Sequence, residues 1–149
     1  MSLLSSNTTR REAIIETAYL VLRVGVSFLF VFHAPQKLLG LYGSPRFPLI
    51  SLRGAGSVIE AVCSPLIALG LFTSYAAVVA AIEMAGAYIV VHMNMLPRPS
   101  WPIENRGELA VLYFFVFVFI AAAGGGRYSL DRMRRRRGPR GHGPPESAS

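Results

Sequence analysis

Four long apolar segments alternate with short polar stretches along the chain. The apolar segments cover about residues 18–41, 55–72, 74–93 and 107–123. Turn-forming residues such as Gly43-Ser44-Pro45 and Thr73-Ser74 separate them. Each segment is close to the roughly 20 apolar residues that a helix needs to cross a bilayer core. The pattern predicts four transmembrane helices.

These segments lack the polar face that a helix in a soluble bundle shows to water. The stretch AAVVAAIEMAGAYIVV, residues 76–91, contains a single charged side chain. Over all 149 residues, 52% are hydrophobic and 15% are charged, which is too apolar for a soluble domain of this size. We therefore predict an all-α fold, an integral membrane four-helix antiparallel bundle.

The net charge of +7 is concentrated at the two ends of the chain. Nine basic residues lie there: Arg10, Arg11, Arg127, Arg132, Arg134, Arg135, Arg136, Arg137 and Arg140. Because basic residues stay in the cytoplasm, this asymmetry predicts that both termini of the multi-pass protein are cytoplasmic.

This topology divides the chain into three parts. Residues 1–16 form a cytoplasmic N-terminal segment, residues 17–123 the bundle, and residues 124–149 a basic, largely disordered cytoplasmic tail. Arg134 to Arg137 are expected to set the orientation and to contact anionic lipids of the bilayer. No aromatic residues alternate with these arginines to stack on bases, so nucleic acid is not an expected partner.

Ionisable residues within the apolar segments are the candidate functional residues, because such residues are costly in a membrane and mark functional positions. The candidates for a ligand site or polar cluster are His33, Lys37, Glu60, Glu83, His92 and Glu108. In the four-span topology all of them except Glu83 lie at one depth, in the outer third of the bilayer. Lys37 is expected to pair with Glu60 or Glu108 across neighbouring helices.

Helical periodicity limits which of these residues can meet. Glu60 shares one face with Ser57, Cys63 and Ser64, a narrow polar stripe suited to the bundle interior. Glu83 and His92 point in opposite directions, so one pocket cannot hold both. Pro35 is expected to bend the outer end of the first span.

Several of these residues also have purely structural interpretations. Lys37 at a helix end can extend to the interface, and Glu108 can form a capping box with Asn105. His92 fits an interfacial side chain as well as a ligand. No metal site is predicted, since HExxH and paired Glu-x-x-His motifs are absent. Cys63 is the single cysteine, so the chain cannot carry out thiol–disulfide exchange unaided.

Five sequence pieces, in order, resemble the DoxX family of small bacterial membrane proteins. They are LVLRVGVSFLFVFHAPQKLLG, IEAVCSPLIALGLFTSYAA, AAIEMAGAYIVVH, WPIENRGELAVLYFFVF and GGGRYSLD. The family's H-G-x-x-K reads His33-Ala34-Pro35-Gln36-Lys37 in this chain. The resemblance covers about Tyr19 to Asp131. It implies a four-span bundle in the bacterial inner membrane, related to the DoxD and DoxX subunits of quinone oxidoreductases.

The resemblance and the polar cluster together lead to three hypotheses of function. The first is an accessory subunit of a quinone-linked or redox-protective membrane complex, with other membrane or periplasmic redox proteins as partners. The second is a quinone-binding oxidoreductase subunit, in which His33 or Lys37 donates to a quinone carbonyl and Glu60 or Glu83 passes the proton; Phe28, Phe32 and Tyr113 would line its pocket. The third is a small-molecule or proton transporter centred on Glu83. Quinone is the one cofactor that these hypotheses name.

Overall fold

The computed structural model describes residues 2–93 and 101–137, and every regular element in these two ranges is helical. The elements are α1 (Ser2–Val31), α2 (His33–Leu39), α3 (Leu52–Leu69), α4 (Thr73–Ala87), the π-helix η1 (Tyr88–Met93), α5 (Pro102–Asn105), α6 (Glu108–Ala123) and α7 (Leu130–Arg137). Predicted positions that fall between 94 and 100 or beyond 137, including Arg140, lie outside the described residues.

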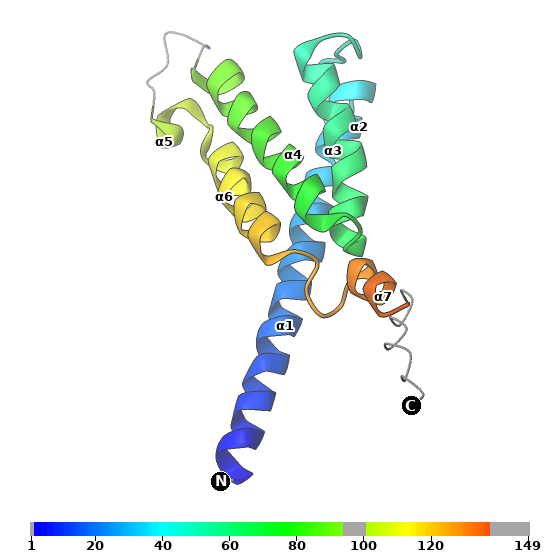
Figure 1. The fold of residues 1–149 in the computed structure, drawn as a ribbon. Helices are drawn as coiled ribbons and strands as arrows, with labels where there is room; N and C mark the ends of the chain where they lie inside the picture. The colour runs from blue at the N-terminus through cyan, green and yellow to red at the C-terminus, as the bar shows by residue number, and fades with distance from the viewer. Residues whose placement is uncertain (1, 94–100, 138–149) are drawn as a thin grey trace, which may run out of the picture.

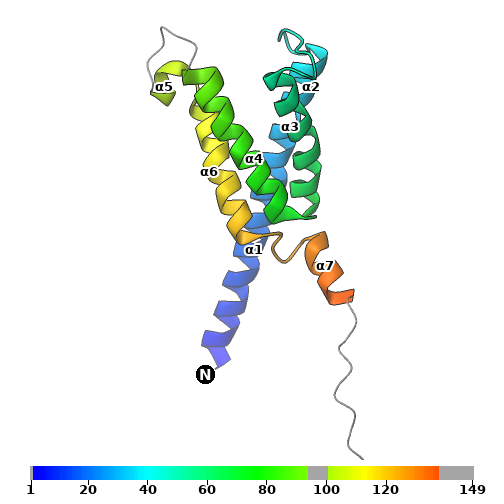
Figure 2. The same cartoon turned by 45° about the horizontal axis from the view of Figure 1, so that its top comes forward.

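The helices form two groups that diverge toward one end of the molecule (Figures 1 and 2). One group contains α1, α2 and α3, and the other contains α4 and α6, which pack closely against each other. The short connection between α3 and α4 joins the two groups at the opposite end. The N-terminal end of α1 and the helix α7 lie at this joined end (Figure 1). The molecule is therefore wedge-shaped, and it opens toward α2 and α5.

Three described helical segments are long and apolar enough to cross a membrane: Thr9–Leu39, Leu52–Leu69 and Thr73–Met93. The fourth predicted span corresponds to α6, an apolar helix of 16 residues. At about 1.5 Å per residue, α6 is about 24 Å long. The protein is thus an all-helical membrane protein with these elements.

The predicted boundaries shift where the helix geometry itself changes. The helix of the first span starts far earlier than residue 18: α1 also includes most of the predicted N-terminal segment. It is interrupted at Phe32. Pro35 lacks an N–H and so cannot bond to the Val31 carbonyl, one turn earlier, which explains the predicted bend. In contrast, α3 continues as one helix through Pro65, although a proline inside a helix favours a kink.

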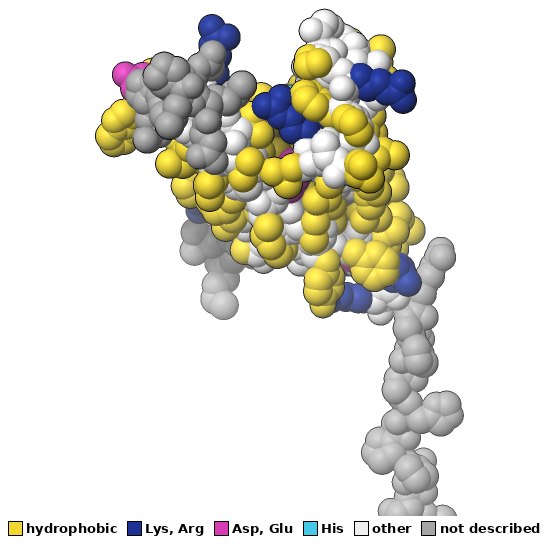
Figure 3. Space-filling model, turned by 90° about the horizontal axis from the view of Figure 1, so that it is seen from above, with side chains coloured by type: hydrophobic (Ala, Val, Ile, Leu, Met, Phe, Trp, Pro, Cys, Tyr) yellow, Lys and Arg dark blue, Asp and Glu magenta, His cyan; other side chains and the backbone are white. Residues whose placement is uncertain are grey.

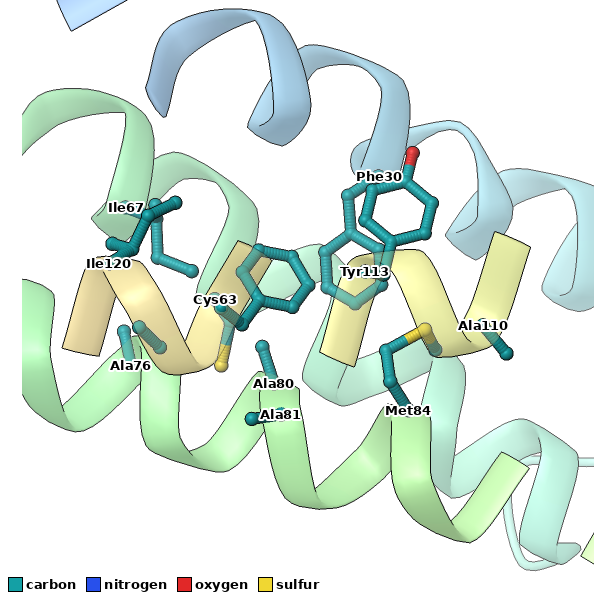
Figure 4. Close-up of a cluster of buried hydrophobic side chains, with 12 residues drawn as sticks. Phe30, Cys63, Ile67, Ala76, Ala80, Ala81, Met84, Ala110, Tyr113 and Ile120 are labelled. Carbon is teal, nitrogen blue, oxygen red and sulfur yellow. The ribbon is translucent and has the colours of Figure 1, made fainter. Parts of the chain in front are cut away.

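Small residues of α4 bring it close to its neighbours in the core. Ala76, Ala77, Ala80 and Ala81 are buried along one side of α4, as the close-up in Figure 4 shows for three of them. Without a water-driven hydrophobic effect in lipid, helices associate through such close backbone approach and van der Waals packing. Larger side chains from α1, α3 and α6 fill the space opposite them: Phe30, Ile67, Phe117 and Ile120.

The segment after α6 folds back onto the joined end of the bundle. Asp131 accepts hydrogen bonds from the backbone N–H of Phe72 (2.8 Å) and of Thr73 (3.0 Å) and from the Thr73 hydroxyl (2.8 Å). It thereby caps the start of α4 from a distant part of the chain. Buried Arg23 of α1 donates from Nη2 to the Tyr128 carbonyl at 2.6 Å. Within the segment predicted to be a largely disordered tail, residues 130–137 form the helix α7, and residues 138–149 lie outside the described residues.

Gly70 is the position where α3, Arg23 and this folded-back segment meet. It ends α3 in the left-handed conformation, with φ +71°, and its carbonyl accepts from the Asp131 N–H at 2.9 Å. A Cβ at Gly70 would lie 2.0 Å from Arg23 Nη1 and 2.5 Å from Ser129 Cβ. Only glycine fits both this conformation and this space.

Candidate functional site

Near the open end of the wedge, an ion pair joins α2 to α3 within one group of helices. Lys37 Nζ lies 2.6 Å from Glu60 Oε1. The Glu60 side chain is 1% exposed and that of Lys37 is 23% exposed. This is the predicted pairing of Lys37 with Glu60 rather than with Glu108. It places a buried carboxylate against an ammonium that reaches the surface.

The predicted polar stripe of α3 is buried along its whole length. Ser57, Glu60, Cys63 and Ser64 are each at most 5% exposed. Ser64 donates its hydroxyl to the Glu60 carbonyl (2.6 Å), so it satisfies the helix backbone rather than the carboxylate. Glu60 Oε2 has no hydrogen-bond partner among the described residues. A buried acceptor is therefore left available.

A cavity of about 290 Å³ opens beside this ion pair, between the two groups of helices. We call it the Lys37 cavity. Its wall consists of His33, Gln36, Lys37, Ser44, Phe47, Arg53, Glu60, Met84, Ala87, Val91, His92, Arg106, Leu109, Ala110 and Tyr113. Seen from the open end, one basic group lies in the middle of this face with an acidic side chain just below it, and other basic side chains lie toward the margins (Figure 3).

The aromatic wall of the Lys37 cavity continues into the core. The Tyr113 ring is stacked near Phe117, with centroids 5.7 Å apart, and meets His33 edge-on at 6.1 Å. Figure 4 shows Tyr113 beside Phe30 at the centre of the buried cluster. Tyr113 is therefore in the predicted position. Phe28 and Phe32, also predicted to line a pocket, are instead 61% and 40% exposed and lie outside this wall.

The π-helix η1 and the turn at Arg106 form the far side of the cavity. His92 Nδ1 lies 3.1 Å from the carbonyl oxygen of buried Asn105, within hydrogen-bonding distance. Asn105 Oδ1 accepts from the Gly107 N–H at 2.8 Å and so shapes the turn before α6. The wider π turn changes the direction in which residues after Ala87 project. His33 and His92 consequently line the same cavity.

Glu83 lies in a separate, mostly apolar cavity of about 240 Å³ between α3 and α4, which we call the Glu83 cavity. The two cavities share Lys37, Arg53, Ala87 and Val91 in their walls. Oε2 of Glu83 is buried without a hydrogen-bond partner in the described part of the chain. A Cβ on Gly56 would lie 2.8 Å from the other carboxylate oxygen, so α3 and α4 approach closely here. As predicted, Glu83 and His92 do not share one pocket.

Glu108 does not join the cluster. Its side chain is exposed and borders a different surface hollow with Ile103 and Arg106. The expected capping box is absent too: α6 begins at Glu108, and its N-cap residue is Gly107. The left-handed turn at Arg106, with φ 60°, separates Asn105 from the helix start.

Two arginines of the site were not predicted from the sequence. Arg53 and Arg106 both line the Lys37 cavity, and the Arg53 guanidinium lies over the Phe47 ring at 4.8 Å. Both were assigned to connecting segments. The signal that could have identified Arg53 is its spacing from Glu60, because seven residues are two helical turns.

The site offers several hydrogen-bond donors and one free carboxylate oxygen within an apolar and aromatic wall. Lys37, Arg53 and Arg106 outnumber the single acidic residue of the wall, Glu60. This arrangement suits a polar ring or head group that accepts hydrogen bonds on one side and is apolar elsewhere. Among the described residues, no group of three or more His, Cys, Asp or Glu side chains is placed to hold a metal ion.

The fold and site define a small helical membrane protein with a polar pocket between its helices. Residues 18–93 match the DoxX family, and the chain belongs to this family. It is 38% identical over 117 residues to an uncharacterized protein of Haemophilus influenzae, covering 74% of this chain and 85% of that protein. It is 28% identical over 131 residues to an uncharacterized membrane protein of Mycobacterium tuberculosis, covering 78% of this chain and 80% of that protein. No solved structure matches.

Proposed function

We propose that α1–α2, α3, α4–η1 and α6 are four spans of the bacterial inner membrane and that both termini are cytoplasmic. The start of α1 and α7 lie at the same end of the molecule, which supports an even number of crossings (Figure 1). The described arginines of the two tails are at this end, as the positive-inside rule requires. In this orientation the Lys37 cavity lies near the outer surface.

We further propose that the protein is a small subunit of a quinone-linked redox complex and that the Lys37 cavity holds a quinone head group. The observation that carries this proposal is the placement of the Lys37–Glu60 ion pair and Tyr113 in the wall of one cavity. Pockets for small molecules are mostly apolar with a few converging polar groups, and roughly 300–1,000 Å³ in volume. The Lys37 cavity is at the lower end of this range and so suits a single ring.

The residues of the wall fit the hydrogen-bonding chemistry of a quinone. Lys37, His33 and Tyr113 can donate to a carbonyl oxygen, and the free oxygen of Glu60 can accept a proton. A bound quinone would supply two-electron redox chemistry. The chain's own residues would bind and orient it and hold a proton at Glu60. With one cysteine in the chain, the electron donor is assigned to a partner protein, which makes this an accessory role.

The experiment is to purify the full chain in mild detergent and to measure bound quinone per protein after extraction. We expect quinone in the wild type and in the control Glu108→Gln, whose side chain is exposed and outside the cavity. We expect it to fall strongly in Lys37→Met, His33→Ala and Tyr113→Phe. Since His33 and Tyr113 lie outside the ion pair, their variants should lose quinone with little change in melting temperature.

A structural role for the cluster is the second candidate, favoured by the burial of Glu60 and its short contact with Lys37. In that case the wild type would contain no quinone, and added quinone would not raise its melting temperature. The Lys37 and Glu60 variants would then change stability only. These results would overturn the quinone proposal and leave the ion pair as a link between α2 and α3.

A further inference from the structure

A third cavity lies at the other end of the molecule, where α7 folds against the end of α3. It has a volume of about 400 Å³, and its wall contains Leu69, Arg127, Tyr128, Leu130, Met133 and Arg136 together with Ser129. We call it the Arg127 cavity. It shares no residue with the Lys37 or Glu83 cavity.

The geometry around the Arg127 cavity is fixed by hydrogen bonds to other parts of the fold. Arg23 holds the Tyr128 carbonyl, and Asp131 binds the backbone at the start of α4. Glu16 Oε2 accepts from the Arg127 N–H at 2.8 Å. These contacts come from α1 and from the start of α4, so the two arginines of the wall lie on a built surface rather than on a free tail.

The two guanidinium groups of this wall have no acidic partner in the described part of the chain. Arg127 and Arg136 form no ion pair among residues 2–93 and 101–137. The Arg127 guanidinium lies 5.9 Å from the Tyr128 ring centroid. Glu16 accepts from the Arg127 N–H, and Glu12 and Glu16 border a neighbouring hollow with Arg127 without forming an ion pair to it. Arg134, by comparison, lies over the Phe72 ring at 5.2 Å and is directed elsewhere. The cavity is therefore cationic.

The same wall is apolar on the side that faces the end of the helices. Leu69 and Met133 are 57% and 51% exposed although both are apolar. These side chains lie at the level where the apolar helices end. There the guanidinium groups suit the phosphate of a phospholipid, and the exposed apolar side chains suit its first acyl carbons.

We propose that the Arg127 cavity binds the head group of one anionic phospholipid. Arg127 and Arg136 bind the phosphate, and Leu69 and Met133 contact the acyl chains. This site does not depend on quinone binding. It also differs from the general attraction of the basic tail to the membrane, because it requires two particular arginines.

The test is native mass spectrometry of the full-length protein in detergent micelles doped with phosphatidylglycerol or phosphatidylcholine. The wild type should retain phosphatidylglycerol preferentially. Because each arginine would donate charge-assisted hydrogen bonds to the phosphate, Arg127→Gln/Arg136→Gln should weaken phosphatidylglycerol binding by more than about tenfold. Binding of phosphatidylcholine should not change.

The matched control is Arg11→Gln/Arg135→Gln, which removes the same charge from exposed positions outside the cavity. We expect less than about a threefold loss from this pair, because it affects only the diffuse field. Equal losses in the two pairs, or equal binding of both lipids by the wild type, would overturn the proposal. If the double variant is unfolded by circular dichroism, the single variant Arg136→Gln gives the same comparison against Arg135→Gln.

A soluble competitor distinguishes a lipid from a free phosphate ester. Glycerol 3-phosphate carries the same phosphate chemistry without acyl chains. It should not displace phosphatidylglycerol at millimolar concentration, and Leu69→Ser should weaken lipid binding. Displacement by glycerol 3-phosphate, with no effect of Leu69→Ser, would assign the site to a soluble anion instead.

Discussion

The two partners of the ion pair differ in their access to water, and this difference determines what each contributes. Glu60 is 1% exposed and Lys37 is 23% exposed. A charge left alone in a low-dielectric interior is strongly destabilising, whereas a charge that reaches the surface retains much of its solvation. The two single substitutions are therefore not equivalent.

Lys37→Met should destabilise the protein more than Glu60→Gln does. It leaves the buried carboxylate without a counter-ion, a change of about 3–5 kcal/mol. Glu60→Gln keeps a hydrogen-bond acceptor beside an ammonium group that can extend toward water. We therefore expect the free energy of unfolding to fall by only about 1–2 kcal/mol. Thermal unfolding in one detergent measures both, and the double variant should lose less than the sum. Additive losses would show that the two side chains are not energetically coupled.

Asp131 is an ionisable residue that links the segment after α6 to the start of α4. Burial acts to raise its pKa, but the hydrogen bonds from Thr73 and Phe72, with nearby Arg134, outweigh burial and lower the pKa below its ordinary value of 3.8. A carboxyl group whose pKa is lower in the folded state stabilises the fold at pH values above its ordinary pKa. This stabilisation is lost as the pH falls through the lower pKa of the folded state.

Asp131→Asn should lower stability at pH 7 by about 1 kcal/mol, as loss of a helix cap does. The variant should also lose less stability than the wild type when the pH falls below about 4, because it lacks the carboxylate that is protonated there. Melting temperatures of both proteins between pH 3 and pH 7 test this. Parallel pH profiles would contradict the assignment of the acid-sensitive cap to Asp131.

At this scale the sequence predicted the residues on regular helices better than those in turns. Ser57, Glu60 and Ser64 are buried as the helical period indicates, because α3 is one continuous helix. Glu108 was misplaced, since the left-handed turn at Arg106 redirects the chain just before α6. Long-range contacts such as that of Arg23 with Tyr128 join residues that no local pattern connects.

At the scale of elements, the connection between α2 and α3 closes the Lys37 cavity. The Phe47 N–H donates to the Lys37 carbonyl at 2.9 Å, and the Ser51 side chain caps α3 by accepting from the Gly54 N–H at 3.1 Å. Gly54 lets this connection lie directly on α3, because a Cβ there would be 2.0 Å from the Pro48 carbonyl oxygen. Backbone atoms, unlike a flexible side-chain end, cannot move aside cheaply.

Gly54→Ala should therefore destabilise the protein by about 1–3 kcal/mol, as overpacking does. It should also reduce quinone binding by displacing the wall around Phe47. Gly25→Ala is the control, because nothing lies within 4 Å of a Cβ at that helical position. That change should be neutral or stabilise by up to about 1 kcal/mol. Thermal unfolding of both variants checks the comparison, and equal effects would contradict this account of the connection.

At the scale of the whole molecule, hydropathy predicted the number and order of the apolar helices but not how they are grouped. The hydrophobic pattern and the length of an apolar helix depend on its own segment of sequence. The bounds of α3 and α4 therefore lie close to the predicted ranges. The division into two groups depends on which helices approach through small residues, as α4 does toward α6. The interruption at Phe32 and the π-helix then determine which side chains face the space between the groups.

The proposed orientation can be tested by labelling single cysteines in a Cys63→Ala background. Pro45→Cys, an exposed position between α2 and α3, should react in intact spheroplasts with a membrane-impermeant maleimide. Ser149→Cys should react only after the membrane is opened, because the proposed orientation places the basic tail in the cytoplasm, as the positive-inside rule requires. The reverse pattern would place the Lys37 cavity near the cytoplasm and the Arg127 cavity at the outer leaflet. Such a result would reverse the sides assigned to both sites, whereas the contacts that build each cavity would stand.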